Sequence, residues 1–274
     1  MIRPRHALIP EAYEDRPFYS RLVKGAREEV KIALKARHLP PARKFVIFAQ
    51  GRTGSTLLTS TLNSHPLIRC DDEILIVPRA RPLSFIEMSA RVAPAEAYGF
   101  HVKITQLLAW QRIRDVAGFL AHMEGAGWTI LYLRRENILR HVVSNVFAEA
   151  AGGYHISGEG RARPDRITLP LDRLAYEMRL RTELGEAERA ALKGRAHTAL
   201  VYERDLQTSE QQTETFVRLQ DAIGVPHANL SSGLRKMVVK TLAELLTNYD
   251  EVADWMRRNP DYTYHLEDDI PCPA

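Results

Sequence analysis

The chain has 274 residues, 45% of them hydrophobic, which is enough to bury a sizeable core as one large domain or two small ones. Its formal net charge of +4 suits an anionic ligand, but its arginine-rich stretches have almost no interleaved aromatic residues, which argues against nucleic-acid binding. Cys70 and Cys272 lie too far apart to suggest a disulfide framework or a cysteine metal site. The N-terminal stretch lacks the apolar core of a signal peptide, and no apolar run is long enough for a bilayer, so we expect a cytoplasmic protein.

Residues 16–37 predict a basic amphipathic helix within an N-terminal arm, residues 1–43. The other faces of this helix are mostly charged. Its apolar positions follow helical spacing: Phe18, Leu22, Ala26, Val30, Ala33 and Leu34. Packing of this helix on its own domain is the expected outcome. Peripheral contact with a membrane surface is the alternative, because a basic amphipathic helix can lie in the interface.

Four later apolar runs predict β-strands, at residues 45–49, 98–104, 128–135 and from 197 onward. Helical patterns fall between and after them, at 55–64, 109–124, 139–151, 171–192, 210–223 and 240–259. Strands that alternate with helices predict an α/β fold, in which helices flank a central parallel sheet, over a single domain of residues 44–274. The irregular stretch 151–170 is long enough for a substrate lid or a mobile loop.

The stretch "AQGRTGST" joins the first strand to a helix and predicts an anion-binding loop. Gly51 and Gly54 allow backbone amides to point at one anion, and the helix dipole favours negative charge. A nucleoside-triphosphate loop would carry a glycine and a lysine where this chain has Ala49 and Ser55. The strand of residues 128–135 also ends in arginines rather than in a magnesium-binding aspartate. An ATP-dependent kinase is therefore the less favoured interpretation, and a tight turn that serves only packing is another.

Two motifs resemble those of sulfotransferases that use 3′-phosphoadenosine 5′-phosphosulfate (PAPS). "QGRTGSTLL" is similar to their 5′-phosphosulfate loop, and "LYLRRENILRHVVS" is similar to their 3′-phosphate motif. "NSHPLIRCDDEIL" and "LLTNYDEV" resemble bacterial carbohydrate sulfotransferases of the Nod-factor and lipopolysaccharide type. The resemblance spans roughly residues 45–249 and implies a P-loop-type three-layer fold.

The resemblance also implies which residues bind the cofactor. The loop residues would surround the 5′-phosphosulfate: Gly51, Arg52, Thr53, Gly54, Ser55 and Thr56. Ser144 would bind the 3′-phosphate with Arg134 or Arg135. Arg135 is preferred because it is nearer the helix start, although it lies one residue farther from Ser144 than is usual in the family. Further cofactor-binding candidates are a tyrosine on the adenine side and two cations in "LRKMVVK", a stretch similar to the basic closing loop: Tyr202, Arg235 and Lys236.

The implied reaction moves the sulfuryl group of PAPS to a hydroxyl of a carbohydrate or glycolipid and releases adenosine 3′,5′-bisphosphate. Arg52 would stabilise the leaving phosphate, so no metal is expected. Glu73 in "DEI" is the preferred general base, whereas Asp72 would point to the opposite side of an extended segment. His101 is the rival base, and Lys103, on the same strand face, is the candidate transition-state cation.

Besides the kinase, one further class of function stays open. A nucleotide-binding or membrane-associated protein without catalysis would keep the anion-binding loop and transfer nothing. The residues do not identify the acceptor, and a homo-oligomer is left open.

Overall fold

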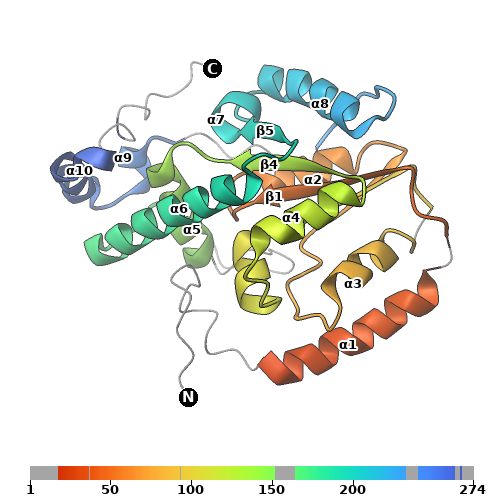
Figure 1. Ribbon diagram of the computed structural model, residues 1–274. Coiled ribbons are helices and arrows are strands. Elements are labelled where there is room, and N and C mark those ends of the chain that lie inside the picture. Colours follow the sequence, from red (N-terminus) through yellow and green to blue (C-terminus); the bar gives the residue numbers. More distant parts are fainter. Residues whose placement is uncertain are drawn as a thin grey trace. The chain divides into compact units, whose positions relative to one another are not determined.

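The computed structural model describes residues 18–36, 38–92, 94–151, 164–232, 240–262 and 266 (Figure 1). The chain divides into two compact units: unit 1 comprises Met1–Arg134 and Leu184–Leu234, and unit 2 comprises Arg135–Glu183 and Arg235–Ala274. The first helix, α1 (Phe18–Lys35), belongs to unit 1 together with the first strand, so residue 43 is not a boundary between the units. The single domain predicted over residues 44–274 stays a prediction.

Unit 1 is built on a five-stranded, entirely parallel sheet with the strand order β2-β3-β1-β4-β5. This confirms the predicted α/β fold with a parallel sheet between helices. The strands are β1 (Arg43–Ala49), β2 (Ile68–Asp71), β3 (Ala97–Val102), β4 (Trp128–Arg134) and β5 (Thr198–Val201). The short edge strand β2 was not predicted, because two apolar residues in four, Ile68 and Cys70, are too few for a periodicity.

Alternation along the strands divides the core between the two faces of the sheet. Phe45 and Ile47 of β1 pack in one buried cluster with side chains of α2 (Ser55–Leu62) and α8 (Ser209–Ile223). Phe48, which points the other way, contacts the ring of Tyr132 at 6.1 Å between centroids. Helix α4 (Val116–Gly125) packs against β4. The sheet is therefore covered on both faces, as continuous apolar strands require.

Two predicted helices are wrong in their extent. The predicted helix 109–124 is a π-helix, η2 (Gln106–Trp110), followed by α4, which Asp115 begins by accepting a hydrogen bond from the Gly118 amide. The predicted helix 240–259 is two helices, α9 (Leu242–Leu245) and α10 (Tyr249–Arg258), because the intervening chain bonds instead to Ile167 through backbone amides. A further helix, α3 (Pro82–Ser89), was not predicted.

Unit 2 has its own buried apolar cluster, formed by side chains from four helices and the bridge at Ile167. Its helices are α5 (Ile138–Ala150), the first part of α6 (Leu171–Leu192), α9 and α10, followed by the short η3 (Pro260–Tyr262). The remainder of α6 lies in unit 1, where the short α7 (Tyr202–Asp205) follows β5. Among the described residues, no helix combines the length and the apolar composition needed to cross a bilayer.

The strand order places a topological switch point between β1 and β4. From β1 the chain passes to β2 and β3 on one side of the sheet, and then returns past β1 to β4 and β5 on the other side. The connections that leave β1 and β4 therefore run in opposite directions. In open parallel sheets, ligands bind at the carboxyl ends of the two strands that flank such a point.

Candidate active site

The glycine-bearing loop follows β1 at the switch point and turns directly into α2. Arg52 has a φ of 67° and Gly54 a φ of 95°, so the turn uses the left-handed region twice. A non-glycine residue there is strained, and such strain concentrates at functional sites. Gly54 is the N-cap residue and offers no side chain, and the first helical bond runs from the Leu58 amide to its carbonyl. The preceding amides of α2 thus lack intrahelical acceptors and face the helix start.

Some side chains of the loop are buried and shape the turn, whereas others lie on its surface. Thr53 is 1% exposed, and its hydroxyl donates to the Gln50 carbonyl at 2.8 Å, so this hydroxyl shapes the turn. Gln50 in turn donates to the fully buried Glu188, which also accepts from Tyr132. Burial raises the pKa of Tyr132, which keeps its hydroxyl a donor. Thr56, in contrast, is exposed at the first turn of α2.

Two close approaches explain why the loop carries glycines. A Cβ on Gly51 would lie 3.3 Å from Lys103 Nζ, and a Cβ on Gly54 would lie 2.8 Å from the ring of Tyr202. Tyr202 begins α7 and packs partly buried against the core beneath the loop. The first contact matters more for function, because it places the candidate cation Lys103 directly beside the candidate anion loop.

Glu73 lies at the centre of a polar cluster next to this loop. Lys103 Nζ is 2.6 Å from Glu73 Oε1, and Gln106 Nε2 donates to Glu73 Oε2 at 2.5 Å. Gln106 is itself held, because its Oε1 accepts from the Lys103 amide at 3.1 Å. The side chains of Glu73 and Lys103 are 23% and 20% exposed. A carboxylate and an ammonium group are thus fixed in place and still reachable by a ligand.

Sequence reasoning did not identify Gln106. It begins the π-helix η2, four residues after the end of β3, and π-helical turns are frequent at functional sites. The signal available in the sequence was its place three residues after Lys103, close to the carboxyl end of a buried strand. That signal is weak, since the amide reaches Glu73 only through the tertiary fold.

His101 is buried within the same cluster, with 1% of its surface exposed. Its Nε2 lies 3.2 Å from the Ala49 carbonyl, and because a carbonyl only accepts, this nitrogen carries a proton. Nδ1 faces the carboxylates of Asp72 at 3.6 Å and Glu73 at 3.9 Å. The ring is therefore anchored to the end of β1 and sits behind the carboxylates.

The expectation that Asp72 points away from Glu73 is wrong. Both carboxylates face His101, and one ligand atom from each of the three residues lies within 4.8 Å of the others. The backbone leaves the strand after Asp71, so the alternation of an extended segment no longer applies. Carboxylate and imidazole groups are ligands for several divalent cations, although Lys103 already supplies Glu73 with a positive charge.

Asp71 takes no part in this cluster. Its carboxylate accepts a hydrogen bond from the Tyr98 hydroxyl at 3.0 Å and pairs with Arg69 at 3.0 Å. Burial and the nearby carboxylate raise the pKa of Tyr98, so the phenol stays a donor and holds Asp71 in place. Asp71 therefore has a structural role at the edge of the sheet.

The predicted 3′-phosphate residues are divided between the two units. Arg134 is the last residue of β4 in unit 1, whereas Arg135 and Ser144 belong to unit 2. Ser144 lies on α5, whose start is capped by Asn137 accepting from the Arg140 amide at 2.9 Å. Arg235 and Lys236, together with residues 152–163 of the predicted lid, lie outside the described residues.

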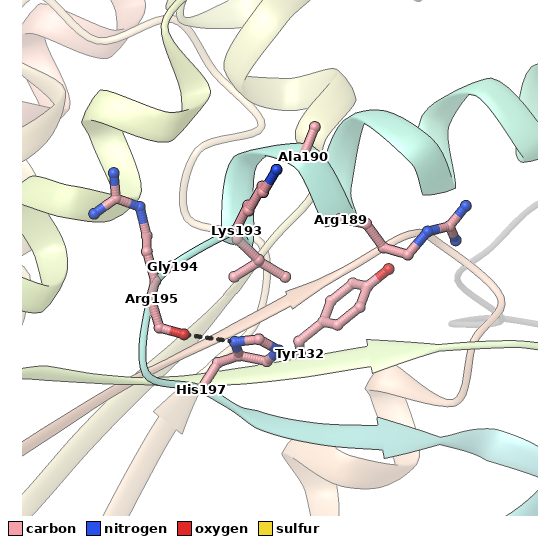
Figure 2. Close-up of a pocket in the computed structure, with 8 residues that line it drawn as sticks. Tyr132, Arg189, Ala190, Lys193, Gly194, Arg195 and His197 are labelled. Carbon is pink, nitrogen blue, oxygen red and sulfur yellow. Dashed lines mark hydrogen bonds between the residues drawn. The ribbon is translucent and has the colours of Figure 1, made fainter.

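A separate hollow of about 440 Å³ lies beside β4 and the end of α6 (Figure 2). Figure 2 shows the ring of Tyr132, from β4, and the ring of His197, just before β5, with Arg189 and Lys193 above them. The two rings meet edge to face at 6.1 Å between centroids. None of the predicted site residues lines this hollow.

Comparison with known proteins assigns no relatives, since no family model matches the chain and no curated protein is significantly similar to it. The fold and the site define the class of protein by themselves. It is an α/β protein with a parallel sheet, whose switch point carries a glycine-bearing loop beside a glutamate–lysine pair.

Proposed function

We propose that this protein is a PAPS-dependent sulfotransferase that acts on a hydroxyl of a carbohydrate or glycolipid. The observation that carries the proposal is the contact between the two halves of the site. Lys103 lies 2.6 Å from Glu73 and would lie 3.3 Å from a Cβ at Gly51, so an acid–base pair borders the anion loop. The motifs "QGRTGSTLL" and "LYLRRENILRHVVS" supply the identity of the anion. The five-stranded parallel sheet is compatible with the P-loop-type fold that these motifs imply.

In the proposed reaction, Glu73 accepts the proton of the acceptor hydroxyl as its oxygen attacks the sulfur. The new S–O bond forms while the bond from sulfur to the bridging phosphate oxygen breaks, and the electron pair leaves with adenosine 3′,5′-bisphosphate. Arg52 and the amides of the loop stabilise the negative charge on the leaving 5′-phosphate. Lys103 exchanges its contact with Glu73 for the sulfuryl oxygens, which it can do because it borders both groups.

The direct test is a calorimetric titration of the full-length protein with adenosine 3′,5′-bisphosphate and with AMP. If the 3′-phosphate is bound, the bisphosphate should bind about ten-fold more tightly or better, since one charge-assisted hydrogen bond is worth about 1.5–3 kcal/mol. Ser144→Ala should reduce this preference, and Ser84→Ala, at an exposed serine of α3, should not. Equal affinity for both nucleotides would refute the proposal. Transfer from PAPS to a panel of sugars then identifies the acceptor.

A magnesium-dependent kinase is the second candidate, and one observation favours it. Asp72, Glu73 and His101 present ligand atoms within 4.8 Å of one another, which gives a divalent cation a place that the sequence did not reveal. The contact of Lys103 with Glu73 favours the sulfotransferase, because an ammonium group repels a metal ion at the same carboxylate. Transfer that survives excess EDTA supports the first candidate. ATP-dependent transfer that EDTA abolishes and magnesium restores supports the second.

A further inference from the structure

Within the described residues, helix α1 packs on the rest of unit 1 through one side. A Cβ on Gly25 would lie 1.9 Å from the Pro78 carbonyl oxygen, so the helix touches the backbone there. Arg79 is bound to Glu28 at 2.7 Å, and the Ala80 amide donates to Glu29 at 2.6 Å. Both acidic residues of α1 are thus occupied on the side that faces residues 78–81.

The opposite side of α1 carries a stripe of large apolar side chains in solvent. Tyr19 is 76% exposed, Val23 55%, Val30 60% and Leu34 70%. At 3.6 residues per turn these four positions fall within an arc of about 60°. Val30 and Leu34 were expected to pack on the domain, and that expectation is wrong because Gly25 marks the buried side.

Cations border this stripe and no acid lies on it. Four exposed basic residues lie next to the apolar arc on the outer side of the helix: Lys24, Arg27, Lys31 and Lys35. The exposed side of α1 is therefore itself amphipathic, with an apolar half and a cationic half. This division is separate from the one between the packed and exposed sides of the helix.

We infer that the outer side of α1 docks on an anionic lipid bilayer, with the apolar stripe in the interface and the lysines at the headgroups. A helix with these two halves lies in the plane of the interface, and anionic lipid attracts the basic half. A second copy of this chain fits less well, because self-association would bring its cations close together. A protein partner fits less well too, since lysine is depleted at protein interfaces. This inference does not depend on the proposed function.

The test is co-sedimentation of the full-length protein with vesicles. One set is phosphatidylcholine alone, and the other contains about one-quarter phosphatidylserine. We expect binding to the second set and little to the first. Lys31→Gln/Lys35→Gln should weaken binding by roughly five-fold per cation removed. Val30→Ser/Leu34→Ser should weaken it as strongly, whereas Val217→Ser, at an exposed valine of α8, should leave it unchanged.

Thermal melting of each variant checks the fold, which these exposed substitutions should leave intact. Three results would overturn the inference. The first is a failure to bind either set of vesicles, and the second is equal binding to both sets. The third is a dimer that forms without vesicles and that Val30→Ser/Leu34→Ser dissociates. The last result would assign the stripe to a second copy of the chain.

Discussion

Lys103 Nζ lies 2.6 Å from Glu73 Oε1, although the two residues are thirty positions apart in the sequence. Lys103 follows β3, and Glu73 follows β2, its neighbour in the sheet. Parallel pairing brings the carboxyl ends of these strands together. The pair therefore depends on β2, the strand that the sequence pattern did not predict.

Glu73→Gln should lower turnover by about 10²–10⁴-fold while nucleotide binding persists, because a general base contributes on that order. Asp72→Asn should cost much less, since its side chain is 47% exposed, whereas that of Glu73 is 23% exposed and lies 2.6 Å from Lys103 Nζ. His101→Ala should mainly lower stability, because the ring is buried and anchored to Ala49. Steady-state rates and melting curves measure these effects. Near-full turnover in Glu73→Gln, with loss in His101→Ala, would make the imidazole the base.

Gln106→Leu should lower kcat about ten-fold with little change in KM, because the amide is buried and orients Glu73. The deciding measurement is a double-mutant cycle. If Gln106 acts through Glu73, adding Gln106→Leu to Glu73→Gln should slow turnover no further. Additive losses would instead assign Gln106 an independent or purely structural role.

Arg52→Ala should slow transfer strongly while the fold is retained, since the guanidinium is proposed to serve the ligand. Arg52→Gly should be equally slow yet more stable than Arg52→Ala by up to about 1 kcal/mol, because φ at this position is 67°. Chemical denaturation gives the stabilities. A variant with unchanged rate would mean that the backbone amides bind the anion without help.

Gly54→Ala should destabilise the protein more than Gly127→Ala does. Both glycines have positive φ, 95° and 81°, but an added Cβ meets the Tyr202 ring at 2.8 Å only at Gly54. A Cβ added at Gly127 would meet no other residue beyond its chain neighbours within 4 Å, so this variant reports the backbone strain alone. The difference, about 1–3 kcal/mol for overpacking, is measured by denaturant unfolding. Equal losses would mean that Tyr202 moves away freely.

Cys70 should resist alkylation in the native protein near pH 8, where an ordinary exposed thiol reacts readily. Burial raises the pKa of the Cys70 thiol, so the reactive thiolate is scarce, and the sulfur is also inaccessible. The measurement is the rate of iodoacetamide labelling in a Cys272→Ser background, with and without denaturant. Similar rates in both conditions would show that β2 opens readily.

Local sequence alone determined the long features of this protein: the buried strand before the glycine loop, the helices α5, α6 and α8, and the α/β class. Those patterns span many residues, and their apolar periodicity favours the same strand or helix whatever the order of the strands in the sheet. Only the tertiary structure decided that Gln106 contacts Glu73, that Asp72 turns toward His101, and that Val30 faces solvent. These contacts depend on the order of the strands in the sheet and on one or two residues where the backbone leaves regular geometry. A periodic pattern of apolar residues carries no information about either.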